Sequence, residues 1–462
     1  MERNSNMGSK NKVRFIDLFA GIGGIRLGFE QAAKTLGLET ECMLTSEIKP
    51  HAIEVLKQNY PNEKISGDIT RIQTSDIPDF DFLLGGFPCQ SFSAAGKRLG
   101  FMDTRGTMFF EIERILKAKR PFGFILENVE GLINHDKIDK KAKIGRTLST
   151  IIEHLEDLGY KVEWKLLNSK KFGLAQERKR VYIVGTKMES PSLENFKIKT
   201  TRLESILEQG KPTLKTKFTE LLLAHFSVDE LYGKSIKDKR GGQNNIHSWD
   251  IELKGPVSDE QKKLLNQLFK ERRKKKWAED FGIDWMDGMP LTFAQILTFY
   301  PHDDLRYMLE DLVKKGYLKK EHPKRLVKET NLLGETKTIR KQDSNLPLGY
   351  NIVSGKLSFE VNKVLSPKDV SPTLVAMDMK KLFVVDNGGL RTLTLKEGLK
   401  LFGFPEDYKF DVEIEEGYDL LGNTVTVPIV KAVSERLLAI WNNVNTNKYE
   451  IISTRSIQQT NV

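Results

Sequence analysis

Val13-Arg-Phe-Ile-Asp-Leu-Phe-Ala-Gly-Ile-Gly-Gly24 is the stretch that opens the predicted fold. Its apolar first half predicts a buried strand, and the glycines after it predict a tight turn into a helix that runs to about Leu36. Because Gly21, Gly23 and Gly24 lack a Cβ, a ligand can approach their backbone closely. The spacing is not that of a dinucleotide-binding turn, and an ordinary strand-to-helix connection is the alternative.

Two further short strands end in acidic residues. Met43 to Glu47 predicts a second strand, and Glu47 lies 26 positions after Gly21. That spacing is close to the one at which an acid meets the ribose hydroxyls of a nucleotide-like cofactor, although a solvated surface glutamate is the alternative. Gly67-Asp-Ile69 ends a third strand, where Asp68 either faces an adenine amino group or caps the next turn.

A cysteine stands at the exit of the next strand. Phe80 to Leu84 predicts a buried strand, and the loop after it reads Gly85-Gly-Phe-Pro-Cys-Gln-Ser-Phe-Ser-Ala-Ala-Gly-Lys-Arg-Leu-Gly-Phe101. Chemistry in open parallel sheets takes place at the carboxyl ends of strands, so Cys89 lies where a nucleophile belongs. Pro88 helps to aim the thiol because it restricts the backbone. A small buried hydrophobe is the other interpretation of Cys89.

Charged residues follow the later strands. After a predicted helix over Thr107 to Ala118, the buried strand Phe122 to Leu126 leads into Glu127-Asn128-Val129, and a carboxylate there is costly unless it is functional or paired. A structural hydrogen bond is the alternative for Glu127.

A helix over Ile144 to Leu158 and strands over Val162 to Leu167 and Val181 to Gly185 complete the alternation. Arg178 and Arg180 alternate at a strand start and so share one face, unless they are simply solvated.

Together these motifs resemble those of the cytosine carbon-5 DNA methyltransferases. The resemblance covers about residues 13–186 and 371–441, and includes the Pro-Cys-Gln-Ser loop, Asp103-Thr-Arg-Gly106, Glu127-Asn-Val129, Gln176-Glu-Arg-Lys-Arg180, Ser371-Pro-Thr-Leu374, Arg391-Thr-Leu-Thr394 and Gly422-Asn-Thr-Val-Thr-Val-Pro428. It implies an α/β fold with a doubly wound mixed sheet of the S-adenosylmethionine-dependent methyltransferase type. A second, smaller target-recognition domain interrupts that fold.

The resemblance also implies a cofactor, S-adenosyl-L-methionine, which leaves as S-adenosyl-L-homocysteine. Phe19 would pack on the adenine, Glu47 would bind the ribose, and Asp68 with Ile69 would frame the adenine edge. Many family members carry an aromatic residue where this chain has Ile48, so we expect weaker cofactor binding. The implied cofactor pocket consists of Phe19, Gly21, Gly23, Gly24, Glu47, Ile48, Asp68, Ile69, Pro88, Asn423 and Val425.

For catalysis the resemblance implies a covalent route. The Cys89 thiolate adds to cytosine carbon 6 and makes carbon 5 nucleophilic, Glu127 holds ring nitrogen 3, and Arg180 with Arg178 holds the other edge. Gln90 belongs to the same implied catalytic set. The cytosine must be flipped out of the duplex, and the loop would close behind it. The expected DNA contacts are Ser91, Lys97, Arg98, Arg105, Arg272, Arg273 and Lys274.

The regular alternation stops near Glu189. We therefore expect a disordered N-terminus over 1–12, a catalytic and cofactor-binding domain over 13–189, a target-recognition domain over 190–385, a return segment over 386–441 and a loose tail over 442–462. In the second domain a capping box predicts a helix over Asp259 to Phe281 that ends at Gly282. Its basic residues either track phosphates or form a solvated face.

Leu291 to Lys320 predicts two helices, with a strand from about Gly316. This pair is either a DNA-reading helix-turn-helix or an ordinary helical hairpin.

Composition restricts the partners. The net charge of +10 over 462 residues suits a polyanion, and duplex DNA is the expected substrate of a monomeric enzyme. Two cysteines and seven scattered histidines predict neither a disulfide framework nor a metal site, which suits a bacterial cytoplasm. The longest apolar runs are too short to cross a membrane. A cognate restriction endonuclease is a possible partner, while a transfer RNA methyltransferase and a catalytically silent DNA-binding regulator are the alternatives.

Overall fold

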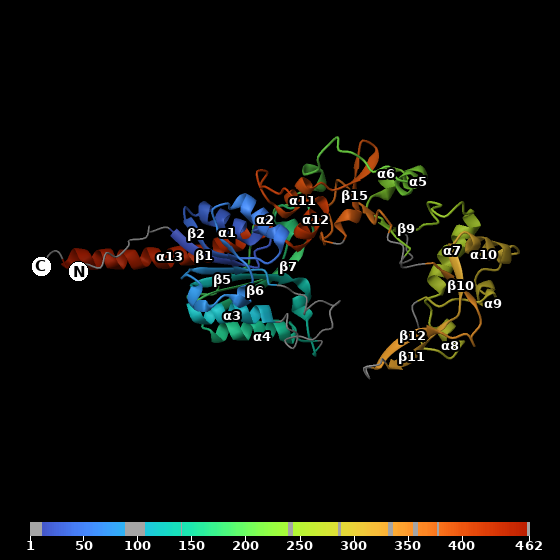
Figure 1. Ribbon diagram of the computed structural model, residues 1–462, viewed down its shortest axis with the longest axis horizontal. Coiled ribbons are helices and arrows are strands. Elements are labelled where there is room, and N and C mark those ends of the chain that lie inside the picture. The colour runs from blue at the N-terminus through green and yellow to red at the C-terminus, as the bar shows by residue number, and fades with distance from the viewer. Residues whose placement is uncertain are drawn as a thin grey trace. The chain divides into compact units, whose positions relative to one another are not determined.

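The computed structural model describes residues 12–87, 107–139, 141–238, 244–284, 288–330, 336–353, 359–376 and 378–459. The chain forms two compact units, whose elements are labelled in Figure 1. The first unit combines Met1–Glu208, Pro367–Lys380 and Leu393–Val462, and the second combines Gln209–Ser366 and Lys381–Thr392. Both units are therefore assembled from segments far apart in the sequence.

A seven-stranded mixed sheet forms the centre of the first unit. Its strands are β1 (Lys12–Leu18), β2 (Glu39–Ser46), β3 (Ile65–Ser66), β4 (Phe82–Gly85), β5 (Gly123–Val129), β6 (Lys161–Asn168) and β7 (Lys179–Thr186). Their order is β3-β2-β1-β4-β5-β7-β6, and β7 runs antiparallel to both of its neighbours, β5 and β6, while the other pairs are parallel. The predicted doubly wound α/β fold is confirmed. Because the order reverses between β1 and β4, a crevice is expected at their carboxyl ends.

Helices cover both faces of this sheet. On one face α3 (Thr107–Lys119) and α4 (Arg146–Asp157) pack against side chains such as Ile16, Leu83 and Phe124 (Figure 1). On the other, α1 (Gly24–Thr35) and α13 (Val427–Gln459) pack against Phe15, Phe82 and their neighbours. Successive residues of a strand point to opposite faces of the sheet, so neighbouring residues pack into different cores.

The end of the chain completes the first unit. A Cβ on Gly28 of α1 would lie 2.6 Å from the Cβ of Val430 in α13, so glycine permits this close helix pair. Helices α2 (Pro50–Asn59), α11 (Leu395–Phe402) and α12 (Ile414–Asn423) complete its main helices. Helix α13 continues to Gln459. The prediction of a loose tail from residue 442 is therefore wrong for residues 442–459, which are helical. Neither proline nor glycine interrupts residues 442–459.

The second unit contains two apolar clusters. The first lies with a five-stranded sheet in the order β16-β15-β14-β8-β9 and helices α5 (Lys217–His225) and α6 (Val228–Leu231). The strands are β8 (Ser235–Ile236), β9 (Asn245–Ile246), β14 (Lys363–Val364), β15 (Leu382–Asp386) and β16 (Gly389–Thr392).

The second cluster joins α7 (Asp259–Glu271), α8 (Lys276–Glu279), α9 (Phe293–Leu297) and α10 (Leu305–Lys314) to the antiparallel pair β10 (Leu318–Glu321) and β13 (Gly349–Ile352). The predicted capping box of Ser258 and Gln261 is confirmed. The single helix predicted over Asp259 to Phe281 is wrong, because α7 ends at Glu271 and α8 is a separate short helix. The two helices and the strand predicted between Leu291 and Lys320 are confirmed. Among the described residues no helix is long and apolar enough to cross a membrane.

Candidate active site

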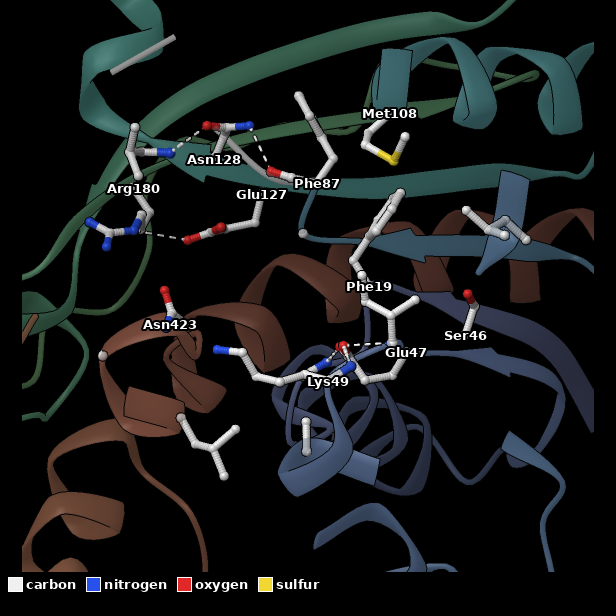
Figure 2. Close-up of a pocket in the computed structure, with 18 of the residues that line it drawn as sticks. Phe19, Ser46, Glu47, Lys49, Phe87, Met108, Glu127, Asn128, Arg180 and Asn423 are labelled. Carbon is white, nitrogen blue, oxygen red and sulfur yellow. Dashed lines mark hydrogen bonds and ion pairs between the residues drawn. The ribbon is translucent and has the colours of Figure 1, made fainter. Parts of the chain in front are cut away.

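A cavity of about 440 Å³ opens in the first unit, where β1, β2, β4 and β5 end. Figure 2 shows many of the residues that form its walls. They come from the ends of several strands, from β7 and from the C-terminal end of α12, so both ends of the chain contribute. The lining residues are Phe19, Gly21, Ser46, Glu47, Ile48, Lys49, Ala52, Asp68, Ile69, Gly86, Phe87, Met108, Glu127, Asn128, Val129, Arg178, Arg180, Leu420, Gly422 and Asn423.

Glu47 is fixed at the end of β2 by three backbone N–H groups. Its carboxylate accepts hydrogen bonds from Gly21 at 2.7 Å and from Ile48 and Lys49, each at 2.8 Å. The bond to Gly21 joins the glycine turn after β1 to the end of β2. Phe19 precedes this turn with a φ of 56°, a left-handed conformation that is uncommon for a phenylalanine. An aromatic side chain and an anchored carboxylate therefore share one side of the cavity (Figure 2).

Asp68 caps the short helix η1 (Ile69–Arg71) and also lines the cavity. It accepts hydrogen bonds from the Thr70 amide at 3.0 Å and the Thr70 hydroxyl at 2.8 Å. These bonds lower the pKa of Asp68 from its ordinary value, so the carboxylate is ionised at neutral pH. The side chain of Ile48 at the same end is 71 % exposed, which leaves an apolar surface at the cavity.

Three other residues of the expected cofactor set do not line the cavity. They are Gly23, Gly24 and Val425. A Cβ on Gly24 would lie 2.8 Å from Val425 Cγ2, and Val425 is 7 % exposed. Gly24 and Val425 therefore lie at the close packing between the glycine turn and the chain before α13, and a Cβ on Gly23 would lie 3.2 Å from Leu56 Cδ2. The other described members of the set line the cavity.

Glu127 and Arg180 form a nearly buried pair on another side of the cavity (Figure 2). Arg180 Nε lies 3.2 Å from Glu127 Oε1, and the exposed fractions of the two side chains are 12 % and 10 %. The two groups are not aligned for a hydrogen bond, so Oε1 has no hydrogen-bond partner among the described residues. Burial raises the pKa of Glu127, and the charges of Arg180 and Arg178 oppose that rise. A protonated Glu127 is a hydrogen-bond donor that faces the cavity.

Arg178 points its guanidinium into the protein and is 2 % exposed. It donates hydrogen bonds to the carbonyl oxygens of Leu374 at 2.9 Å, Gly422 at 3.1 Å and Thr424 at 2.8 Å. Burial lowers the pKa of Arg178 to about 9, so the side chain still carries its charge at neutral pH. Arg178 thus ties β7 to the end of α12, and these contacts differ from the base contact expected for it.

Asn128 has a structural role at this site, although the Glu127-Asn-Val129 motif predicted none for it. Its side-chain amide donates to the Phe87 carbonyl at 3.2 Å, and its side-chain oxygen accepts from the Val129 amide at 2.9 Å. Phe87 is the last described residue before the cysteine loop. The buried Asn128 therefore fixes the point from which that loop leaves the sheet.

Several expected residues lie outside the described part of the chain. Residues 88–106 are not described, and they include Pro88, Cys89, Gln90, Ser91, Lys97, Arg98 and Arg105.

The expected DNA contacts of the second unit differ from one another. Arg272 is 6 % exposed and donates to Asn351 Oδ1 at 2.5 Å, while Lys274 pairs with Glu271 at 2.6 Å. Arg273 is half-buried, with its guanidinium over the ring of Phe269. Burial of the Arg272 guanidinium leaves it poorly placed for a DNA phosphate.

Known proteins resemble this chain along nearly its whole length. The family described as C-5 cytosine-specific DNA methylase matches residues 13–439. Type II methyltransferase M.NlaIV of Neisseria lactamica is 62% identical over 427 residues, which cover 92% of this chain and 99% of the relative. Type II methyltransferase M.BanI of Aneurinibacillus aneurinilyticus is 42% identical, over 94% of this chain and 97% of the relative. Among solved structures, the Entamoeba histolytica methyltransferase EhMeth shares the fold, with a TM-score of 0.51 at 15% identity over 93% of this chain and 99% of that one.

Proposed function

This chain belongs to the C-5 cytosine-specific DNA methylase family, and from that premise we propose how its cavity works. The protein is a DNA (cytosine-5-)-methyltransferase of the kind found in type II restriction-modification systems. The observation that carries the proposal is the cavity itself, which has the Glu47 carboxylate on one side and the buried Glu127–Arg180 pair on another. We assign the first side to the cofactor and the second to the target cytosine.

The family uses S-adenosyl-L-methionine, which supplies an activated methyl group when bound. The residues present fit this cofactor, because Glu47 is held by three backbone donors and still faces the cavity, where its remaining lone pairs can accept from ribose hydroxyls. Phe19 and the exposed Ile48 offer apolar surface for the adenine, and Asp68 offers an acceptor for its amino group. A Cβ on Gly21 would meet nothing within 4 Å, which leaves space beside the turn.

At the other side we propose the following roles. The thiolate of Cys89 attacks cytosine carbon 6, forming a carbon–sulfur bond, and the electrons of the carbon 5–carbon 6 double bond move into the ring. Protonated Glu127 donates to ring nitrogen 3 and so stabilises the negative charge that develops there. Arg180 holds Glu127 in place and directs its other donors to the same base. Carbon 5 then takes the methyl group, and loss of its proton with expulsion of Cys89 restores the double bond.

A cytosine within a duplex cannot reach such a cavity, so the base must be flipped out. We propose that the second unit is the target-recognition domain that selects a short duplex sequence. We further propose that the enzyme acts as a monomer in a bacterial cytoplasm beside a cognate restriction endonuclease, because its relatives carry type II names.

The deciding experiment maps methylated cytosines. Purified protein is incubated with S-adenosyl-L-methionine and a mixed-sequence plasmid, and the products are read by base-resolution conversion sequencing. Methylation confined to one short motif supports the proposal. Methyl transfer to transfer RNA instead of DNA would favour the RNA enzyme, and no transfer to either would favour the silent regulator.

The covalent step has a matched cysteine control. Cys89→Ala is expected to abolish methyl transfer while S-adenosyl-L-methionine still binds, because only the nucleophile is removed. Cys42→Ala is the control, since Cys42 lies in β2, where its thiol contacts the Leu44 carbonyl and the Thr45 hydroxyl. Retained turnover by the Cys89 variant in a tritium-transfer assay would reject the mechanism.

A further inference from the structure

A two-stranded ribbon in the second unit has no role in the cavity. It consists of β11 (Lys324–Thr330) and β12 (Thr336–Gln342), paired antiparallel from Lys324 opposite Gln342 onward. Its described side chains are mostly exposed on both faces, and neither strand pairs with a third. Figure 1 shows β11 and β12 side by side. An isolated ribbon has little stability of its own, so an exposed one of this length suggests a partner.

The strand register divides the ribbon into two chemically different faces. Directly opposed residues share a face and successive residues alternate. We call one the outer face, formed by Lys324, Leu326, Lys328, Thr338, Arg340 and Gln342, and the other the body face, formed by Arg325, Val327, Glu329, Lys337, Ile339 and Lys341. The outer face contains three cations and no carboxylate. The body face contains the acid of the ribbon, Glu329, in an ion pair with Lys341.

Arg325 orients these two faces. From the body face its guanidinium donates to the carbonyl oxygens of Gly282 at 3.2 Å and Phe281 at 3.4 Å, and it pairs with Asp343 at 2.6 Å. Phe281 packs against the apolar cluster formed around α7, α9 and α10. Because the body face turns toward this cluster at the base of the ribbon, the outer face turns away from it.

We propose that the outer face of the ribbon enters the major groove of the substrate duplex. This inference rests on the proposed function, which makes duplex DNA the substrate. Strands in a sheet lie about 4.8 Å apart, and a two-stranded ribbon fits a major groove about 12 Å wide. Lys324 and Lys328 contact phosphates, while Arg340 and Gln342 offer the donors that guanine and adenine edges require. Leu326, which is 44 % exposed, offers an apolar contact to a thymine methyl group.

The basic strip of α7 and the turn after it is a weaker candidate for this contact. Arg272 is buried there, Lys263 pairs with Glu260 at 2.7 Å and Lys274 pairs with Glu271 at 2.6 Å. Part of the charge of this strip is therefore neutralised within the strip itself, whereas the outer face of the ribbon presents Lys324 and Lys328 without a carboxylate on the same face.

The test compares two triple variants with equal loss of charge. The first changes the outer face, as Lys324→Gln, Lys328→Gln and Arg340→Gln. The control changes three exposed lysines on helices of the first unit, Lys34→Gln, Lys57→Gln and Lys117→Gln. Duplex binding is measured by fluorescence anisotropy over a range of salt concentrations. Calorimetry of S-adenosyl-L-methionine binding shows that the first unit of each variant is folded, and urea denaturation compares the stability of each whole variant with that of the wild type.

If Lys324 and Lys328 each contact a phosphate, the slope of log K against log salt falls by about 1.8, because each phosphate contact contributes about 0.9. Taken from 1 M salt to 0.15 M, the loss of these two phosphate contacts predicts duplex binding weaker by on the order of 30-fold, with KM raised and kcat at saturating DNA kept. The control variant is expected to keep the wild-type slope. Wild-type affinity and slope in the outer-face variant would overturn the inference, and so would an equal loss in the control.

Reading of bases is tested separately from phosphate contact. Leu326→Ala and Gln342→Ala should broaden the set of methylated sequences in conversion sequencing, because base contacts carry specificity while phosphate contacts do not. An unchanged motif in both variants would remove the proposed base readout. Wild-type protein that methylates no DNA would refute the proposed function itself, whereas an active wild type with an unaffected outer-face variant would refute only the role of the ribbon.

Discussion

Replacing Arg178 with alanine should destabilise the first unit and loosen its cavity. The guanidinium makes three hydrogen bonds to backbone carbonyls, at 2.8 to 3.1 Å, from a position that is 2 % exposed. A hydrogen bond from a charged donor is worth about 1.5–3 kcal/mol, and buried acceptors left unpaired add a cost. Since such contributions are not additive, we expect the free energy of unfolding to fall by about 3–6 kcal/mol.

Arg180→Ala is the matched comparison, because Arg180 lies two positions after Arg178, in β7, and among the described residues it donates one hydrogen bond, to the Lys179 carbonyl. Its loss should cost about 1 kcal/mol of stability but remove the charge beside Glu127. Urea denaturation gives the two stabilities, and methyl transfer at saturating DNA gives the two rates. Arg178→Ala should be the less stable of the two variants. Arg180→Ala should lose more methyl-transfer activity than its small loss of stability explains. A stability of Arg178→Ala within about 1 kcal/mol of wild type would refute the structural role.

Three further variants test other parts of the site. Glu47→Ala should weaken S-adenosyl-L-methionine binding more than DNA binding, because the anchored carboxylate is lost; calorimetry with no loss of cofactor affinity would count against the pocket assignment. Glu127→Gln should remove a fall in kcat at high pH, since burial raises the pKa of Glu127 and its proton is lost as pH rises. An identical pH profile in both proteins would contradict this. Burial raises the pKa of Asp17 from 3.8 to about 8, so the folded state holds a proton that the unfolded state releases, and stability should fall as pH rises through that interval. Asp17→Asn should flatten this dependence in denaturation measured from pH 4 to 8, and an unchanged slope would exclude Asp17 as its source.

The local sequence determined most elements of the first unit. Apolar runs of strand length predicted β1, β4, β5 and β7, and the glycine turn predicted the start of α1. These features depend on residues near one another in the chain, so composition and periodicity suffice to recognise them. The sequence also identified the family, because several specific short motifs occur in one chain in the order that is typical of that family.

Contacts between distant segments decided what the sequence left open. Arg178 and Arg180 are two residues apart at the start of β7, yet one is enclosed by carbonyls from residues 374, 422 and 424 while the other faces Glu127. No local pattern distinguishes them. Arg272 was likewise expected at the DNA, but its burial depends on Asn351, 79 positions away.

The same division holds for the cavity and the ribbon. Sequence identified Glu47 and Glu127 as acids after strands, while only the strand order brought them to one cavity with Asn423 from the end of α12. The sequence predicted no role for residues 324–342, and the strand register with the bonds of Arg325 decided which cations share the outer face. Side-chain type is fixed residue by residue, whereas the direction a side chain faces depends on partners that only the folded chain brings together.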